Sequence, residues 1–334
     1  MTRAIRIHEH GGPDVLRWDE VDPGTPGAGQ ALIRQTAAGL NFIDVYHRTG
    51  LYPVPAMPAI IGSEGAGVVE AVGDGVSEVR VGDRVAYCMS LGGYAEQRLI
   101  DAARLVRLPD DITDQQAAAM MLKGCTVQYL VRRIYPVKAG DTILLQAAAG
   151  GVGLIACQWA KHLGATVIGT VGSDEKAELA RSHGCDHPIV YSRENVVERV
   201  KALTDGAGVP VVFDSVGRDT FMASLDCLQP RGLMVSYGNA SGAVEPFSPG
   251  VLAAKGSLFL TRPTLATYIG TRAELEATTA ELFDVVQSGA VKVEVSQVVP
   301  LEDVAQAHRD LEARKTTGST VLTMRSDARS DDDR

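Results

Sequence analysis

The spacing of hydrophobic residues changes near residue 125. Before this point, short alternating runs at 31–36, 65–73 and 83–87 are separated by Gly and Pro, a pattern typical of a compact β-rich barrel. After it, apolar runs of strand length alternate with helical patterns, and the crossovers that this order requires make the strands parallel. Six strands, a complete doubly wound unit, are expected at 142–146, 166–170, 189–191, 211–214, 233–237 and 257–260.

The C-terminal part mixes single strands with helices. A helix is expected over 272–288, a strand over 291–295, a helix after Pro300 and a strand over 320–324. Because a single strand needs a partner, we expect this part to rejoin the N-terminal barrel. The predicted α/β plan is a β-rich catalytic domain of residues 1–124 completed by 263–324, a nucleotide-binding domain of residues 125–262, and a disordered acidic tail, 325–334.

Size and composition are those of a globular protein of about two domains. The chain has 334 residues, of which 45% are hydrophobic and 22% charged. Its net charge of −9 argues against nucleic acid or an anionic membrane as the main partner, because both require a surplus of Lys and Arg. The five cysteines form no CxxC pair, and no apolar run is long enough for a signal peptide or a membrane span. We therefore expect a cytoplasmic protein.

Candidate chemistry begins where the strand 142–146 ends. The following stretch, Ala147-Ala-Ala-Gly150-Gly151-Val152-Gly153, opens a helix and matches the dinucleotide-binding fingerprint with Ala148 at its first glycine position. Gly150 would let the backbone approach a pyrophosphate, Gly153 would let the helix pack on the strand, and the helix N-terminus would bind the anion. Such a turn can also be purely steric, but the strand–helix context and the five strands that follow favour nucleotide binding.

The choice between NADH and NADPH is read at the end of the strand 166–170. An acid there would bind the adenosine ribose and repel a 2′-phosphate, but none is present. Asp174 comes later, where it also fits the first turn of a helix capped by Ser173. Lys176 on that helix can reach a 2′-phosphate, and Tyr191, which ends the third strand, can add a hydroxyl, although they also fit ordinary surface and core positions. The pattern favours NADPH.

Four segments that occur in order along both halves of the chain carry a family resemblance. They are Asn41-Phe-Ile-Asp-Val-Tyr46-His-Arg-Thr-Gly-Leu-Tyr52-Pro, the glycine-rich stretch from Ala148 to Lys161, Asp214-Ser-Val-Gly-Arg-Asp, and Leu233-Met-Val-Ser-Tyr-Gly-Asn-Ala-Ser-Gly. In these segments the chain resembles the NADPH-dependent quinone oxidoreductases, the zinc-free, zeta-crystallin-like branch of the medium-chain dehydrogenase/reductase superfamily, and most closely its bacterial members. The resemblance implies a GroES-like catalytic domain, a Rossmann domain with a doubly wound six-stranded sheet, and a homodimer.

The resemblance also implies which residues meet each part of the cofactor and the acceptor. Residues implied at the 2′-phosphate are Lys176, Tyr191 and Arg314, with Lys315 as the alternative to Arg314, beside Gly172 and Ser173. Those implied at the pyrophosphate are Gly151 and Val152, and those at the nicotinamide are Asn41 and Thr126, with Ser215, Gly238 and the strand from Phe259 to Thr261 along the wall. Tyr46 and Tyr52 are candidates to contact the acceptor, with barrel-core packing as the alternative, and Asn41 and Thr126 would orient it.

Zinc alcohol dehydrogenases of this superfamily hold catalytic zinc with a Cys near position 41 and a His in a Gly-His-Glu motif. This chain has Asn41 and Gly62-Ser63-Glu64 instead, so no catalytic metal is expected. The cluster His183-Gly-Cys-Asp-His187 fits a glycine-capped turn better than a metal site. Hydride addition to a quinone gives a delocalised, weakly basic anion, so positioning and a few hydrogen-bond donors can replace a metal.

Three functions therefore remain in view. The favoured one is NADPH-dependent reduction of a quinone. A second is zinc-free reduction of an α,β-unsaturated aldehyde, ketone or thioester at its double bond. A third is a non-catalytic NADPH-binding protein, either a redox sensor or an RNA-binding, crystallin-like protein.

Overall fold

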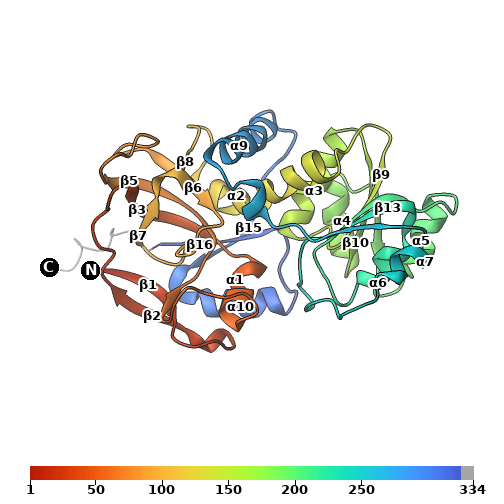
Figure 1. Cartoon of the computed structure of the whole chain (residues 1–334), viewed down its shortest axis with the longest axis horizontal. Coiled ribbons are helices and arrows are strands. Elements are labelled where there is room, and N and C mark those ends of the chain that lie inside the picture. The colour runs from red at the N-terminus through yellow and green to blue at the C-terminus, as the bar shows by residue number, and fades with distance from the viewer. Residues whose placement is uncertain (325–334) are drawn as a thin grey trace. The chain divides into compact units, whose positions relative to one another are not determined.

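The computed structural model describes residues 1–324, which fall into two compact units (Figure 1). The first unit contains Met1–Leu122 and the chain from Val293 onward, and the second contains Lys123–Lys292. In the part of the chain that the structure describes, no helix is both long and apolar enough to cross a membrane. The expected acidic tail, 325–334, lies outside the described residues.

The second unit is built on a six-stranded parallel sheet in the order β11-β10-β9-β12-β13-β14. The chain enters at β9 in the middle, runs outward to β11 and then returns to β12 on the other side, which places a topological switch point between β9 and β12. The strands are β9 (Thr142–Leu145), β10 (Thr166–Val171), β11 (His187–Val190), β12 (Val209–Asp214), β13 (Leu228–Ser236) and β14 (Phe259–Thr261). All six predicted strands are confirmed, with β13 beginning earlier than expected.

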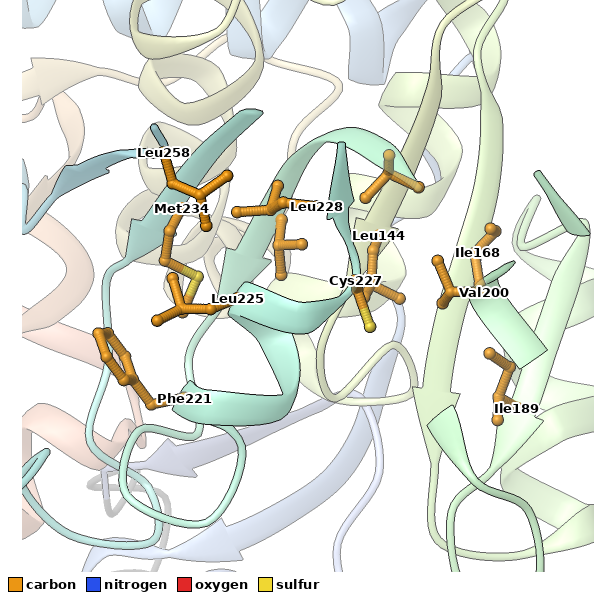
Figure 2. Close-up of a cluster of buried hydrophobic side chains, with 12 residues drawn as sticks. Leu144, Ile168, Ile189, Val200, Phe221, Leu225, Cys227, Leu228, Met234 and Leu258 are labelled. Atoms are coloured by element: carbon orange, nitrogen blue, oxygen red, sulfur yellow. The ribbon is translucent and has the colours of Figure 1, made fainter. Parts of the chain in front are cut away.

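The connecting helices of this unit cover the sheet, as a parallel sheet requires. They are α3 (Gly151–His162), α4 (Asp174–Ser182), α5 (Val196–Leu203), α6 (Phe221–Asp226), α7 (Gly250–Ala254) and α8 (Leu265–Tyr268). Figure 2 shows one side of the core, with Leu144, Ile168 and Ile189 from three neighbouring strands. Ile168 and Ile189 lie near Val200 of α5, and Phe221 and Leu225 of α6 lie near Met234. These side chains are nearly inaccessible to solvent, so burial of apolar surface holds the strands together and fixes their carboxyl ends side by side.

Helix α9 (Arg272–Gln287) belongs to the second unit. It packs on the helical segment formed by α2 (Asp114–Gln128) and the π-helical turn Tyr129–Ile134, where a Cβ on Gly124 would lie 2.4 Å from Leu282. The ring of Tyr129 also stacks on that of Tyr268 at 4.6 Å. These contacts place the boundary after Lys292, whereas the sequence had placed it after residue 262.

The first unit contains two sheets. A seven-stranded sheet has the order β15-β16-β3-β5-β6-β8, with β7 paired to β3, and a three-stranded sheet has the order β2-β1-β4. The N-terminal strands are β1 (Thr2–Ile7), β2 (Leu16–Val21), β3 (Gln30–Gly39), β4 (Ala59–Ile60), β5 (Glu64–Val72), β6 (Arg84–Cys88), β7 (Gln97–Asp101) and β8 (Val106–Arg107). The C-terminal strands rejoin this barrel, because β16 (Ser319–Thr323) pairs antiparallel with β3. The helix over 272–288, which was expected to rejoin it too, belongs to the second unit.

One predicted strand in this region was misplaced. The strand expected over 291–295 is β15 (Val295–Pro300), which pairs parallel with β16. Val291 is instead a buried residue whose backbone N–H donates to the carbonyl of Val285 at the end of α9. Val291 is therefore hydrogen-bonded to the end of helix α9, and Val295 begins the strand. The remaining helices of the first unit are α1 (Phe42–Thr49) and α10 (Val304–Glu312).

Candidate functional site

The glycine-rich turn joins the end of β9 to helix α3. Gly150 is the N-cap residue of the helix, and its nearest neighbour, the carbonyl oxygen of Ala147, would lie 3.3 Å from an added Cβ. A Cβ on Gly153 would lie only 2.4 Å and 2.5 Å from the carbonyl oxygens of Ala147 and Ala148. Gly153 is therefore required by close packing within the turn. Gly150 has more room, so its lack of a side chain leaves the helix N-terminus open to an anion.

Two side chains that the sequence analysis did not single out hold this turn on the sheet. The hydroxyl of Thr170, in β10, accepts the N–H of Ala147 at 3.2 Å and donates to Gln146 at 2.5 Å, while the Thr170 carbonyl accepts the N–H of Ala148 at 2.9 Å. Gln146 in turn donates to Ser224 of α6. A polar residue inside an apolar strand was the available signal, but only the fold shows that it faces the turn.

The second-unit residues predicted at the 2′-phosphate lie together at the carboxyl ends of β10 and β11. A Cβ on Gly172 would lie 2.9 Å from the phenol oxygen of Tyr191, which follows β11 and is 47% exposed. Ser173 is the N-cap residue of α4, and its hydroxyl accepts the N–H of Lys176 at 3.3 Å. The structure thus brings two hydroxyl groups and a lysine to one edge of the sheet.

Asp174 at the same edge is not placed to bind a ribose. Both of its carboxylate oxygens accept hydrogen bonds from Arg193, at 2.6 Å and 2.5 Å. Hydrogen bonding to Arg193 lowers the pKa of Asp174, so the carboxylate stays ionised and paired. Arg193 is a second cation beside the predicted phosphate site. It was missed because it lies two residues beyond Tyr191, in a turn without a recognisable motif.

The predicted nicotinamide wall in the second unit follows the ends of β12, β13 and β14. Gly238 and Ser215 come together, because a Cβ on Gly238 would lie 2.3 Å from the Ser215 carbonyl oxygen. Thr261 pairs with Val235 in the sheet, and Phe259, at the start of β14, is 62% exposed. Together with the turn after β9, Ser215, Gly238 and Thr261 lie at the carboxyl edge at which parallel α/β sheets bind their ligands.

The other predicted residues belong to the start of the second unit or to the first unit. Thr126 is buried on α2 at the beginning of the second unit. Arg314 lies in the first unit, exposed in the turn after α10, with a φ of 58°. Tyr46 and Tyr52, also in the first unit, meet edge to face with ring centroids 5.1 Å apart. Tyr46 is buried on α1 and Tyr52 is half-buried, so Tyr52 is the better placed of the two to meet a ligand.

Asn41, the N-cap residue of α1, lies against two fully buried carboxylates. Its side-chain nitrogen donates to Glu64 at 2.7 Å, and its backbone N–H donates to Asp44 at 2.9 Å. The hydroxyl of Ser63 donates to the second oxygen of Asp44 at 2.8 Å. Asn41 and Ser63 occupy the positions at which zinc alcohol dehydrogenases carry a Cys and a His. Both side chains are therefore hydrogen-bond donors to carboxylates. This donor set does not fit a catalytic zinc ion.

The buried network extends beyond Asp44. Tyr94 donates to Asp44 at 3.0 Å and lies 3.2 Å from Nε2 of His308, whose Nδ1 is 2.8 Å from the guanidinium of Arg48. Arg48 also pairs with Glu312 at 2.7 Å. Burial raises the pKa of Asp44 to about 7. Burial, with the charge of Arg48, lowers the pKa of His308 to about 3. The sequence motif contained Asp44 but gave no reason to connect it with Tyr94 or His308.

Metal-ligating side chains do not gather elsewhere in residues 1–324. No group of three or more His, Cys, Asp or Glu residues in this range could hold a metal ion. In the His183–His187 turn, His183 lies 2.8 Å from the carbonyl oxygen of Leu179, and Cys185 is buried. All five cysteines are free and buried.

Comparisons with known proteins agree with this architecture. A family model described as alcohol dehydrogenase GroES-like domain matches residues 27–110, and one described as zinc-binding dehydrogenase matches residues 151–285. The quinone oxidoreductase of Pseudomonas aeruginosa is 54% identical, covering 96% of this chain and 99% of the relative. A 2-haloacrylate reductase of a Burkholderia species is 47% identical over the same shares of the two chains.

A solved structure is similarly close. The crystal structure of Escherichia coli quinone oxidoreductase complexed with NADPH aligns with a TM-score of 0.95 and 50% identity, covering 96% of this chain and 99% of the other. The predicted combination of a GroES-like domain and a Rossmann sheet is thereby confirmed. The chain belongs to the quinone oxidoreductase family of the medium-chain dehydrogenase/reductase superfamily.

Proposed function

We propose that this protein transfers reducing equivalents from NADPH to a quinone without the help of a metal ion. The observation that carries the proposal is the carboxyl edge of the six-stranded sheet. There the open glycine turn at Gly150 and the cluster of Gly172, Ser173, Lys176 and Tyr191 occur in a member of the quinone oxidoreductase family. Bound NADPH supplies the hydride.

Different residues hold different parts of the cofactor. Gly151 and Val152, in the first turn of α3, direct backbone N–H groups to the pyrophosphate. Lys176 and Tyr191 bind the 2′-phosphate, the lysine by its charge and the tyrosine by its hydroxyl. Arg314 of the first unit adds a further cation to that phosphate. Residues that line the nicotinamide are Asn41, Thr126, Ser215, Gly238, Phe259 and Thr261.

The acceptor needs positioning more than activation. Two electrons and one proton arrive as hydride, a second proton comes from water or a side chain, and the quinone leaves as a hydroquinone. The anion formed on the way spreads its charge over an aromatic ring, so hydrogen-bond donors can stabilise it. Tyr52 and Tyr46 contact the acceptor, with Asn41 and Thr126 orienting it. The protein therefore acts by excluding water and fixing the two rings against each other.

A second candidate function is the reduction of an activated carbon–carbon double bond. The 2-haloacrylate reductase among the relatives supports it. The two reactions use the same hydride donor and differ in the acceptor, so an acceptor panel separates them. NADPH consumption is followed with 1,4-benzoquinone, 1,2-naphthoquinone, 2-chloroacrylate, an enal and an enoyl thioester. Turnover of the quinones supports the proposal, and turnover of the double-bond substrates alone contradicts it.

Two further measurements complete the test. Binding of NADPH without turnover of any acceptor would identify a non-catalytic NADPH-binding protein. Metal analysis of the active protein is expected to give no stoichiometric zinc, because the side chains of Asn41 and Ser63 both donate hydrogen bonds to buried carboxylates. One equivalent of zinc that is needed for turnover would contradict the metal-free mechanism.

The protein acts as a homodimer in this proposal, assembled through the edge strand β14. Among the described residues β14 pairs with β13 alone, and its Phe259 and Leu260 are 62% and 36% exposed. An exposed apolar edge favours pairing with a second copy. Leu260→Glu is expected to convert a dimer to a monomer in sedimentation equilibrium, whereas Val298→Glu on β15 should not. The free thiols fit a cytoplasmic location.

A further inference from the structure

Asn41 is held at two points by two different carboxylates. The backbone N–H donates to Asp44, and the side-chain amide donates to Glu64. Asp44 and Glu64 have no exposed surface, and Asn41 is 7% exposed. Burying two carboxylates around one neutral side chain is costly unless every oxygen is satisfied. Asn41 and Asp44 together form the capping box of α1, so Glu64 is the carboxylate whose position helix capping does not explain.

The two oxygens of Glu64 serve two different donors. Oε1 accepts the Asn41 amide at 2.7 Å, and Oε2 accepts the backbone N–H of Leu122, in α2, at 2.7 Å. A carboxylate can accept at both oxygens, whereas the amide of a glutamine can accept at only one. The two oxygens of the Glu64 carboxylate are thus matched to this pair of donors.

The surroundings leave Glu64 and Asn41 little freedom to rotate. A Cβ on Gly39 would lie 2.2 Å from Oε1 of Glu64 and 2.2 Å from the carbonyl oxygen of Ala118, so only glycine lets the carboxylate lie against β3. The Asn41 amide nitrogen is also 3.4 Å from the Gly39 carbonyl oxygen. With its nitrogen facing Glu64 and Gly39, the planar amide directs its oxygen toward the first turn of α1, where the Asn41 side chain completes the capping box.

We propose that Glu64 is a positioning residue for the reaction: its carboxylate holds the side-chain amide of Asn41 in a single orientation. This inference rests on the proposed function, in which Asn41 lines the nicotinamide. Asp44 secures the same residue from the backbone side and is itself held by Ser63 and Tyr94. Glu64 touches neither cofactor nor acceptor and acts through Asn41.

A double-mutant cycle tests the proposal. Asn41→Ala, Glu64→Gln and the double variant are compared by kcat and KM for 1,4-benzoquinone and by the NADPH dissociation constant. In Glu64→Gln one donor loses its acceptor, and a ~tenfold fall in kcat/KM is expected, the change that corresponds to ~1.4 kcal/mol. The double variant should be no slower than Asn41→Ala, because Glu64 has nothing left to orient.

A control separates positioning from general destabilisation. Asp114 of the same unit accepts hydrogen bonds from Thr36 at 2.7 Å and Arg84 at 2.6 Å but does not contact Asn41. Asp114→Asn should lower the melting temperature. If it also lowers kcat/KM, the fold-loss in the double variant with Asn41→Ala should equal the product of the two single fold-losses. If Glu64→Gln does not fold, Glu64→Asp keeps the buried charge but is one methylene too short to reach both donors, and it takes its place in the cycle.

The possible outcomes are distinct. Unchanged kinetics and NADPH affinity in Glu64→Gln, or losses that multiply with those of Asn41→Ala, overturn the positioning role. Normal kinetics and NADPH affinity in Asn41→Ala overturn it as well, while quinone reduction itself stands. If the wild-type protein reduces no quinone, the proposed function fails, and the cycle on NADPH affinity still decides whether Glu64 acts through Asn41.

Discussion

Asp44 and His308 are joined by a single hydroxyl group, that of Tyr94. The phenol donates to Asp44 at 3.0 Å and lies 3.2 Å from the His308 ring nitrogen. The two groups have opposite pKa shifts for the same reason. Burial disfavours the charged form of each, which raises the pKa of the acid to about 7 and lowers that of the base to about 3. Burial of Tyr94, with the charge of Asp44, raises the phenol pKa as well.

The opposed shifts predict opposed effects on stability. The folded state holds the Asp44 proton up to about pH 7, whereas the unfolded chain releases it near pH 3.8, so this group makes stability fall as pH rises through that window. The unfolded chain binds a proton at His308 below pH 6.5 and the folded state only near pH 3, so this group makes stability rise with pH. Between about pH 4 and 6.5 the two contributions oppose each other.

Single substitutions should expose each contribution. In urea unfolding measured from pH 4 to 7, Asp44→Asn should make the free energy of unfolding rise more steeply with pH than in the wild type, and His308→Leu should make it fall. Each difference in slope approaches one proton per molecule. The groups facing this pair are Glu64 near Asp44 and Arg48 near His308. Asp110→Asn, at an exposed position, serves as the control, and identical slopes in all four proteins would refute the assignment.

The sequence predicted the second unit well because its signals are local. The fingerprint at Gly150–Gly153 and the six apolar runs are each contained within a few residues, and the parallel order follows from the crossovers. The cluster around Lys176 and Tyr191 could also be anticipated, because the carboxyl ends of neighbouring parallel strands must meet.

The buried network of the first unit could not be predicted in the same way. Arg48 and Glu312 are 264 residues apart in the chain, and Tyr94 and His308 are 214 apart. Nothing in the periodicity distinguishes a buried Asp44 from a solvent-facing acid on an amphipathic helix. The position of α9 was missed for a related reason, since its fit against Gly124 depends on a glycine in a different helix.

The two glycines of the phosphate turn should respond differently to substitution. Gly153→Ala places a Cβ against two backbone carbonyl oxygens, at 2.4 Å and 2.5 Å, and should lower the free energy of unfolding by about 1–3 kcal/mol. Gly150→Ala meets one oxygen at 3.3 Å and should cost less than about 1 kcal/mol, yet it should weaken NADPH and NADH alike by narrowing the pyrophosphate site. Urea unfolding and fluorescence titration separate the two effects. Equal stability of both variants would contradict the assigned roles.

Lys176 is expected to select the phosphorylated cofactor. Removing a charge-assisted hydrogen bond to the 2′-phosphate in Lys176→Ala should weaken NADPH about ten- to a hundredfold and leave NADH nearly unchanged. Lys161→Ala is the matched control, because Lys161 lies in the same unit and pairs with Asp186 instead. Calorimetric titration of both cofactors measures the ratio. A loss shared equally by NADPH and NADH would show that Lys176 does not contact the phosphate.

Gly172 is expected to act on the same selectivity through Tyr191. An added Cβ would lie 2.9 Å from the phenol oxygen, so Gly172→Ala must displace the half-exposed ring, which can move at little cost to the fold. NADPH affinity should fall several-fold while the melting temperature stays within a few degrees.

The link between Gly172 and Tyr191 is tested by combining substitutions. In a Tyr191→Ala background the ring is absent, so Gly172→Ala should have no further effect on NADPH affinity, and the two losses should not add. Measured losses that do add would mean that the methyl group obstructs the cofactor directly. In that case Gly172 belongs to the binding surface in its own right, and Tyr191 is not the group through which it acts.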